Sequence, residues 1–220
     1  TANNVANVNT NGYKQDKLLF SEFVNIARNR HLSFSQEMNV RRNESQGTLQ
    51  KTDNVFDLAI TTPKHYFGVE TPSGVKYTRN GNFSISETNA LVTSEGFPVL
   101  SESMGEIVLP TSYSSIEITD SGRILVDNKL AGMIGVFKLE DDSLIKKAGA
   151  STVSYAENTE SAEDGFKIVQ GALENSNVSP VIEMAQMLRI SRTMEEIANL
   201  MSSINKINHR IVNILMESQG

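Results

Sequence analysis

Apolar residues recur at alternating spacings of three and four along about the last fifth of the chain. The repeat comprises Met187, Ile190, Met194, Ile197, Met201, Ile204, Asn208, Ile211 and Leu215, in which Asn208 is the polar member. Because this spacing keeps one stripe of side chains on one side of a helix, it predicts a helix of the coiled-coil type. Ser179 caps a plausible start at Pro180, and no further proline follows. We therefore predict a helix from Pro180 to about Glu217, about 57 Å long at 1.5 Å per residue.

The apolar face of this helix is wider than a single partner helix would cover. Positions beside the stripe, where a two-stranded coiled coil normally has Glu and Lys, are occupied by Leu200, Ile207, Val212 and Ile214. The polar face is narrower and comprises Arg189, Glu195, Glu196, Ser202, Lys206 and Arg210. The pattern favours burial between several neighbours in a bundle or tube. The alternative is a long helix that folds back on the chain's own core.

The middle of the chain has short apolar stretches separated by turn-forming residues. The predicted strands are 56–60, 66–70, 75–78, 83–86, 90–93, 98–100, 106–109, 115–119, 123–126 and 133–139. Pro, Gly, Asn and Asp lie between them, and Asn80-Gly81 is the strongest hairpin signal. We therefore predict a mainly β central domain, sandwich-like or barrel-like, that covers residues 54–165.

Two terminal segments flank this β domain. Residues 1–53 begin with an asparagine-rich run and continue as an extended arm, and residues 166–220 contain the long helix after the acidic linker 157–164. Neither segment can bury its apolar face alone, so we predict that both are assembly segments that become ordered on partners. Contacts between different surfaces of successive subunits produce rings or helical filaments.

Composition excludes several classes of function. The net charge is −6 and the pI is near 5.2, which argues against a nucleic-acid or anionic-membrane partner. The chain has no cysteine, so disulfides and thiolate sites are excluded. No apolar run approaches the roughly 20 residues of a membrane helix, and no signal-peptide pattern is present.

No pattern of catalytic or metal-binding residues emerges. His31, His65 and His209 are too scattered for a helical zinc motif, and the segment 132–135 lacks the third glycine of a dinucleotide-binding loop. The acidic residues gather in sequence that is typical of solvated linkers. We therefore expect no enzyme activity, no cofactor and no metal.

Both ends of the chain carry sequence motifs that resemble those of the bacterial flagellar rod and hook proteins. The N-terminal motif is Ala2-Asn3-Asn4-Val5-Ala6-Asn7-Val8-Asn9-Thr10-Asn11-Gly12-Tyr13-Lys14, and the C-terminal motif is Gln170-Gly171-Ala172-Leu173-Glu174-Asn175-Ser176-Asn177-Val178. Matching segments between them include Gln46-Gly47-Thr48-Leu49, Phe56-Asp57-Leu58-Ala59-Ile60, Tyr77-Thr78-Arg79 and Gly96-Phe97-Pro98-Val99-Leu100. Thr61-Thr62, Met194 and Asn208 depart from the family pattern. Length and the Phe56-Asp57 form of the motif are most similar to a proximal-rod member.

The resemblance implies a structural subunit of the rod that crosses the periplasm and carries torque from motor to hook. It implies helical assembly with copies of itself and other rod proteins, through paired N- and C-terminal α-helical coiled-coil segments with the β domain outside. It also implies export by the flagellar type III apparatus without a cleaved signal peptide, and a helix before Thr1.

The residues expected at the assembly interface are the nine members of the stripe and five residues of the N-terminal motif. These five are Asn3, Asn4, Asn7, Asn9 and Gly12. We assign the asparagines to turn and capping hydrogen bonds, and Gly12 to backbone freedom.

Three alternatives remain open. The first is a distal-rod or hook member of the same family. The second is an adhesin-like binding module with exposed aromatic residues, and the third is a carbohydrate-active enzyme. The enzyme would require a cleft with two carboxylates about 5 to 10 Å apart.

Overall fold

The chain consists of two structural units. The computed structural model describes residues 1–24, 34–141, 144–156, 159, 161–162 and 164–217, and within these it does not describe the side chains of 18–24, 34–40, 208 and 210–217. Unit 1 comprises Thr1–Val5 and Ser179–Gly220, and unit 2 comprises Ala6–Val178.

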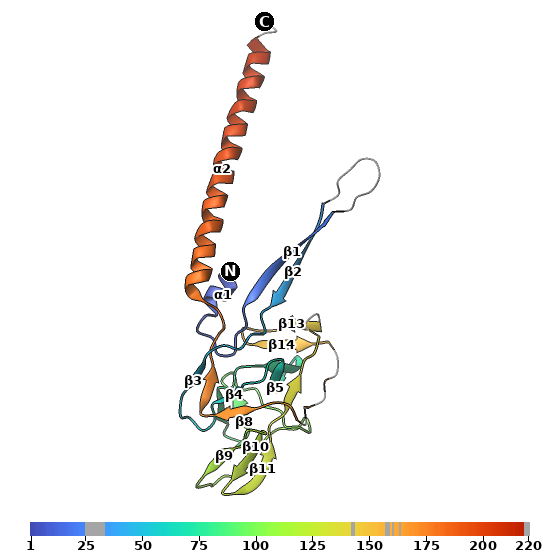
Figure 1. Ribbon diagram of the computed structural model, residues 1–220, viewed down its shortest axis with the longest axis vertical. Helices are drawn as coiled ribbons and strands as arrows, with labels where there is room; N and C mark the ends of the chain where they lie inside the picture. Colours follow the sequence, from blue (N-terminus) through green and yellow to red (C-terminus); the bar gives the residue numbers. More distant parts are fainter. Residues whose placement is uncertain (25–33, 142–143, 157–158, 160, 163, 218–220) are drawn as a thin grey trace. The chain divides into compact units, whose positions relative to one another are not determined.

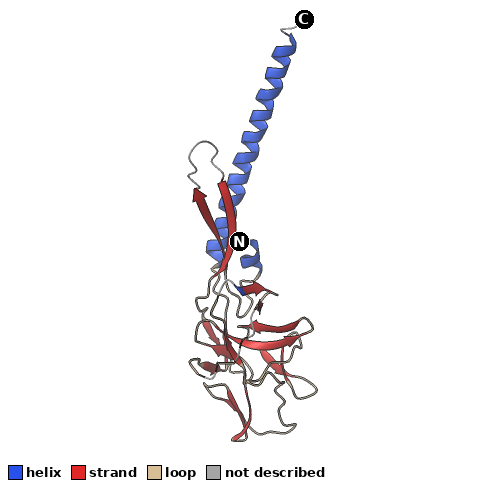
Figure 2. Ribbon diagram, turned by 90° about the vertical axis from the view of Figure 1, so that its right-hand side faces the viewer, coloured by secondary structure: helices blue, strands red, loops and turns tan. Residues whose placement is uncertain are grey.

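Unit 1 is dominated by one long helix, α2, which spans Pro180–Glu217 and contains 38 residues. Both ends agree with the prediction from the apolar repeat. The Glu183 amide donates to the Ser179 carbonyl at 3.1 Å, so the first helical hydrogen bond forms directly after the predicted cap. In Figure 2 α2 is the long blue helix.

The structure does not support the N-terminal α-helical coiled-coil segment that we expected. Helix α1 spans only Ala2–Ala6, and β1 (Asp16–Val24) then pairs with β2 (Phe34–Arg42) in an antiparallel hairpin (Figure 1). The two strands satisfy each other's backbone groups along nine paired positions. They also contain phenylalanine and valine, which favour extended backbone, and this preference prevailed over the polar character of the segment.

Unit 2 is mainly β, as predicted, and is built from several small antiparallel sheets. Its further strands are β3 (Leu49–Lys51), β4 (Leu58–Ile60), β5 (His65–Thr71), β6 (Gly74–Thr78), β7 (Phe83–Ile85), β8 (Leu91–Thr93), β9 (Ile116–Ile118), β10 (Arg123–Val126), β11 (Lys129–Met133), β12 (Val136–Lys138), β13 (Ile145–Lys147), β14 (Thr152–Tyr155), β15 (Ile168–Gln170) and β16 (Ala172–Glu174). Among the described residues the largest sheet has the order β12-β5-β6-β14-β13, and β11-β10-β9 form a second sheet. The other sheets are pairs, β15-β4, β16-β3, β7-β8 and β1-β2.

The core of unit 2 lies between these sheets. Its larger cluster comprises Leu58, Ile60, Phe67, Val69, Phe83, Leu91, Val99, Ile107, Leu109, Ile118, Ile124, Val126, Ile134, Val136 and Ile168. Phe67 and Phe83 meet edge to face with their ring centroids 5.1 Å apart, an arrangement that adds to their burial energy. Because residues from β4 to β15 contribute, the core joins strands that are far apart in sequence.

The hairpin expected at Asn80-Gly81 is absent. Strand β6 pairs with β5 and β14, whereas β7 pairs with β8, so the strands on either side of Asn80-Gly81 are not partners. A Cβ on Gly81 would overlap the Leu58 carbonyl, and the Leu58 amide donates to the Gly81 carbonyl at 3.0 Å. This glycine therefore permits close backbone approach instead of a two-residue turn.

Two strands lie in the segment that the sequence analysis grouped with the C-terminal helix from residue 166. Strand β15 pairs with β4, and β16 pairs with β3. Consequently the residues just before α2 are in extended backbone within unit 2.

Candidate assembly interface

The apolar stripe of α2 is exposed in the isolated chain. Its described members are Met187, Ile190, Met194, Ile197, Met201 and Ile204, and their exposed fractions run from 41% to 68%. Leu200 and Ile207 beside them are exposed as well. Asn208, Ile211 and Leu215 lie within α2, but their side chains fall outside the described part of the structure. The backbone thus has the helical form that the repeat predicted, and the described stripe is available to a partner.

Unit 1 holds its two chain segments together at the start of α2. Asn4 and Glu183 are both buried, and Asn4 Nδ2 donates to Glu183 Oε1 at 3.1 Å. Because a carboxylate in the first turn also faces the positive end of the helix dipole, Glu183 suits this position. Asn4 therefore makes a tertiary hydrogen bond across 179 positions of sequence.

The other predicted N-terminal residues lie in and after α1. The Thr10 amide donates to the Asn7 carbonyl at 3.1 Å, and Thr10 Oγ1 donates to Asn7 Oδ1 at 3.3 Å, so Asn7 shapes a turn. Asn3 and Asn9 are exposed. Gly12 has φ of +70°, a conformation that glycine adopts without strain.

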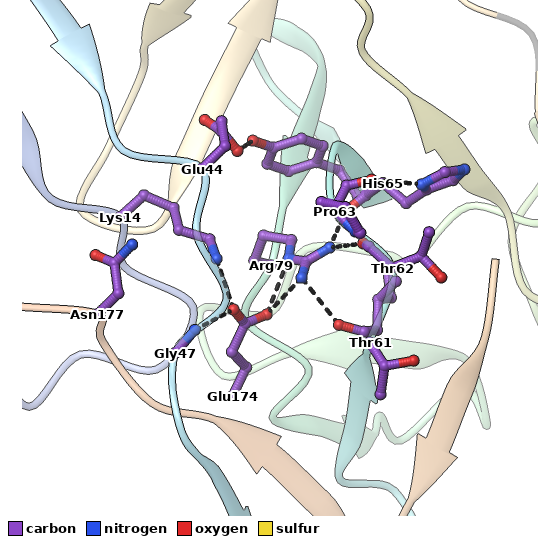
Figure 3. A network of polar contacts seen from close by, with 12 residues as sticks. Lys14, Glu44, Gly47, Thr61, Thr62, Pro63, His65, Arg79, Glu174 and Asn177 are labelled. Carbon is purple, nitrogen blue, oxygen red and sulfur yellow. Dashed lines mark hydrogen bonds and ion pairs between the residues drawn. The ribbon is translucent and has the colours of Figure 1, made fainter.

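A buried charge cluster in unit 2, comprising Lys14, Gly47, Arg79 and Glu174, was not predicted from the sequence (Figure 3). We call it the Glu174 cluster. Glu174 Oε1 accepts from Lys14 Nζ at 2.6 Å and from the Gly47 amide at 3.0 Å. Glu174 Oε2 accepts from Arg79 Nε at 2.9 Å and forms an ion pair with Arg79 Nη2 at 2.8 Å. The three charged side chains are at most 2% exposed, so the carboxylate is paired and hydrogen-bonded as a buried charge requires.

Arg79 has a partner for each of its five N–H groups. Besides the two contacts with Glu174, Nη1 donates to the carbonyls of Thr62 and His65 at 2.7 and 2.6 Å, and Nη2 donates to the Ile60 carbonyl at 2.9 Å. Because guanidinium is planar and rigid, these contacts fix the backbone between β4 and β5 relative to Glu174.

Lys14 completes the cluster from the N-terminal side. Its Nζ also donates to the Ser45 carbonyl at 2.8 Å. Burial lowers the pKa of Lys14, and the neighbouring Glu174 carboxylate offsets part of that shift. A second carboxylate, Glu44, accepts from the Tyr66 hydroxyl, and burial followed by the charge of Glu44 raises the pKa of Tyr66. Glu44 and Glu174 therefore both lie among cations in this region, which include Lys14, Arg42 and Arg79.

The Asn177 side chain links the C-terminal motif to the backbone at residues 15, 43 and 45. Its Oδ1 accepts from the Gln15 amide at 2.7 Å, and its Nδ2 donates to the carbonyls of Asn43 and Ser45, both at 2.8 Å. The side chain thus uses its amide as both donor and acceptor to hold residues on either side of the β1–β2 hairpin.

Two family models match this chain. Residues 60–126 match the model described as flagellar hook protein FlgE/F/G D1 domain, and residues 169–214 match that of the flagellar basal body rod FlgEFG protein C-terminal. A flagellar basal-body rod protein FlgF of Mesorhizobium japonicum is 32% identical over 91% of this chain and 83% of its own length. That of Caulobacter vibrioides is 32% identical over 96% of this chain and 88% of its own length.

The chain belongs to the flagellar basal-body rod protein FlgF family. It is therefore a structural protein of the flagellar basal-body rod and not an enzyme. A rod protein FlgG of Bacillus subtilis is also similar, with 28% identity over 96% of this chain and 90% of its own length. Within the described residues, no group of three or more acidic, histidine or cysteine side chains could hold a metal ion. Nor does any helix among them have the length and apolar character needed to cross a membrane.

Three of the motifs noted in the sequence meet in the Glu174 cluster although they lie far apart along the chain. Lys14 ends the N-terminal motif, Arg79 ends Tyr77-Thr78-Arg79, and Glu174 lies in the C-terminal motif. Their pairings span 160 and 95 positions. A charged residue in each motif was the available signal, but nothing in the local sequence indicates which charge pairs with which.

Proposed function

We propose that this rod protein polymerises through its terminal segments, with copies of itself and with other rod proteins, into a helical assembly. In the proximal rod this assembly would carry torque from motor to hook. The observation that supports the proposal is the exposed apolar stripe along α2. A soluble helix normally turns such a stripe toward a core or a partner.

The energetics favour several neighbours over one. Burying an exposed Ile, Leu or Met side chain completely contributes about 1.5 to 3 kcal/mol, so the described stripe offers on the order of 10 kcal/mol. Association costs roughly 4 to 15 kcal/mol in lost freedom, before side chains are ordered. A single pairing therefore leaves little net free energy of association. Several neighbouring subunits together can bury the stripe and also the flanking Leu200 and Ile207. This difference would keep free subunits apart and the polymer stable.

We also propose coiled-coil packing for this interface, formed by the nine positions of the stripe together with the N-terminal residues Asn3, Asn4, Asn7, Asn9 and Gly12. Asn208 would set the register, since a polar group inside an apolar interface is satisfied in only one alignment. The same proposal includes export through the flagellar type III apparatus without a cleaved signal peptide.

The test is a charge introduced into the stripe. We expect Ile204→Asp to abolish incorporation into basal bodies, because burying an unpaired carboxylate in an apolar interface is strongly unfavourable. The matched control is Ser202→Asp, two positions away on the polar face. Electron microscopy of isolated basal bodies and an assay for hook protein in the medium measure incorporation.

Normal rods with Ile204→Asp would refute the stripe as the interface. A strain that lacks the gene sets the baseline, and it should show missing or truncated rods. Intact rods and hooks in that strain would instead contradict a structural role in the rod.

A further inference from the structure

The two covalent connections between the units leave unit 2 from segments that are bonded to each other. The connections are Val5–Ala6 and Val178–Ser179. Just inside them, the Gly12 amide donates to the Glu174 carbonyl at 2.7 Å, and the Asn177 amide donates to the Tyr13 carbonyl at 3.4 Å. The Lys14–Glu174 ion pair and the bond from the Gln15 amide to Asn177 Oδ1 add two more links between these segments.

Several contacts anchor these segments to the rest of unit 2, including the pairing of β16 with β3 and the bond from the Gly47 amide to Glu174. The buried Arg79–Glu174 ion pair is the charged contact that reaches β4 and β5. Glu174 contacts Arg79, and Arg79 holds three carbonyls between β4 and β5. A force on either connection therefore reaches β4, β5 and β6 through buried, charge-assisted hydrogen bonds as well as along the chain. Such bonds are shorter and stronger than neutral ones.

We propose that the Glu174 cluster is a mechanical joint within unit 2, which transmits torque from the segments that lead to its two covalent connections into strands β4, β5 and β6. This role rests on the proposed function above, because it requires that the helices be fixed in the rod. Lys14 and Glu174 are positioning residues in this joint: they hold together the two segments of unit 2 that lead to the connections.

Lys14→Met tests the joint with the least disturbance to the fold. The substitution is close in volume and leaves the Arg79–Glu174 pair intact and neutral. The control is Lys138→Met, which removes an exposed ion pair with Glu140 of nearly the same length, 2.7 Å against 2.6 Å. In the free full-length chain we expect hydrogen exchange at the Gly12 and Gln15 amides to become at least about tenfold faster than in the control.

The decisive readout is swimming speed as a function of load. We expect Lys14→Met cells to have rods in normal number by electron microscopy, and to swim at the control's speed in dilute buffer. In viscous medium, where the torque on the rod is high, their speed should fall at least twofold below that of the Lys138→Met control. A variant that only destabilised the subunit would instead lower the number of rods at every load.

Equal speeds for the two variants at all viscosities would overturn the joint, and so would a loss of rods in Lys14→Met cells. Failure of the proposed function gives a different result from failure of the joint. If the proposed function is wrong, Ile204→Asp cells will have normal rods. Glu174→Gln provides an independent check: removing the shared carboxylate should accelerate exchange at Gly12 more than Lys14→Met does, and the reverse order would contradict the central place of Glu174.

Discussion

Buried charges dominate the chemistry of this protein at the scale of single residues. Arg79, Lys14 and Glu174 are almost fully buried, and each of their charges has a partner. Replacing a buried ion pair with apolar residues is often neutral, but removing the sole partner of a buried charge costs about 3 to 5 kcal/mol. Glu174 has two cationic partners, so it keeps Arg79 when Lys14 is replaced. The cluster therefore specifies how the segments meet more than it adds net stability.

Tyr66 makes stability depend on alkaline pH. Its pKa is raised above the ordinary value of 10.0, first by burial and then by the Glu44 carboxylate. Above pH 10 the unfolded chain loses this proton while the folded chain keeps it, so stability falls as pH rises, by up to about 1.4 kcal/mol per pH unit. We expect Tyr66→Phe to reduce this slope between pH 10 and 11, measured by urea unfolding.

The control for this prediction is Tyr113→Phe, because Tyr113 is 43% exposed whereas Tyr66 is 1% exposed. Burial also raises the pKa values of Tyr13 and Tyr77, so part of the slope should remain in Tyr66→Phe. Burial lowers the pKa of Lys14, which works in the opposite direction and adds stability as pH rises toward 10.5. An unchanged slope in Tyr66→Phe would show that Tyr66 is not held protonated by its site.

Gly12 has two independent reasons to be glycine. Its φ is +70°, and a Cβ would overlap the backbone of Arg79 and Asn80. Gly96 has a similar φ of +84° but open space around its Cβ position. We expect Gly12→Ala to cost at least about 2 kcal/mol of unfolding free energy and Gly96→Ala about 1 kcal/mol. Equal losses in thermal unfolding would mean that the backbone of Arg79 and Asn80 moves aside easily.

At the scale of elements, the helix and the strands are stabilised by different surroundings. The described stripe of α2 is exposed in the isolated chain, whereas the residues of β4, β5 and β12 are in the core of unit 2. A 38-residue helix has many internal hydrogen bonds, but most helical stability in proteins comes from packing an apolar face. The described part of the helix therefore leaves apolar surface exposed in the isolated chain, while the strands stabilise unit 2.

Replacing isoleucine with alanine should change the free energy of unfolding much more in the core of unit 2 than on the stripe of α2. Ile134→Ala removes a fully buried side chain and should cost about 2 to 5 kcal/mol in unfolding of the free chain. Ile197→Ala removes an exposed side chain of the stripe and should change that free energy by less than about 0.5 kcal/mol. Chemical denaturation followed by aromatic fluorescence measures both, and a large effect of Ile197→Ala would show that the stripe is covered in the free subunit.

At the scale of the whole molecule, the division into two units predicts two unfolding transitions. Unit 1 consists of α2 with a short N-terminal segment, and unit 2 has its own core. We expect helical circular dichroism at 222 nm to be lost at a lower temperature than the near-ultraviolet signal of the buried aromatics, since the described apolar side chains of the α2 stripe are exposed.

Ile134→Ala should shift only the second of these transitions. A single coincident transition would favour the alternative in which the helix folds back on the chain's own core. Two transitions would match a subunit whose helix lacks stabilising tertiary contacts until neighbouring subunits pack against it.

Local patterns were enough to predict the helix and much of the β domain. The bounds of α2 followed from Ser179, Pro180 and an apolar repeat of 3.5 residues, because a helix is stabilised by contacts within a few positions of sequence. Strand β10 was predicted at 123–126 because a short apolar stretch ends there at the turn-forming pair Asp127-Asn128. These two residues form the turn after β10, with positive φ at both. The resemblance of the terminal motifs to flagellar rod and hook proteins also implied a structural rod protein.

Only the tertiary structure decided how distant segments pair. Gly81 looked like a hairpin glycine, but it permits close approach to Leu58, and β6 and β7 have other partners. The pairing of Lys14 and Arg79 with Glu174 across 160 and 95 positions was equally hidden. Local sequence encodes the propensity and exposure of each segment, whereas the partner of a buried charge or strand depends on which segments the folded core brings together.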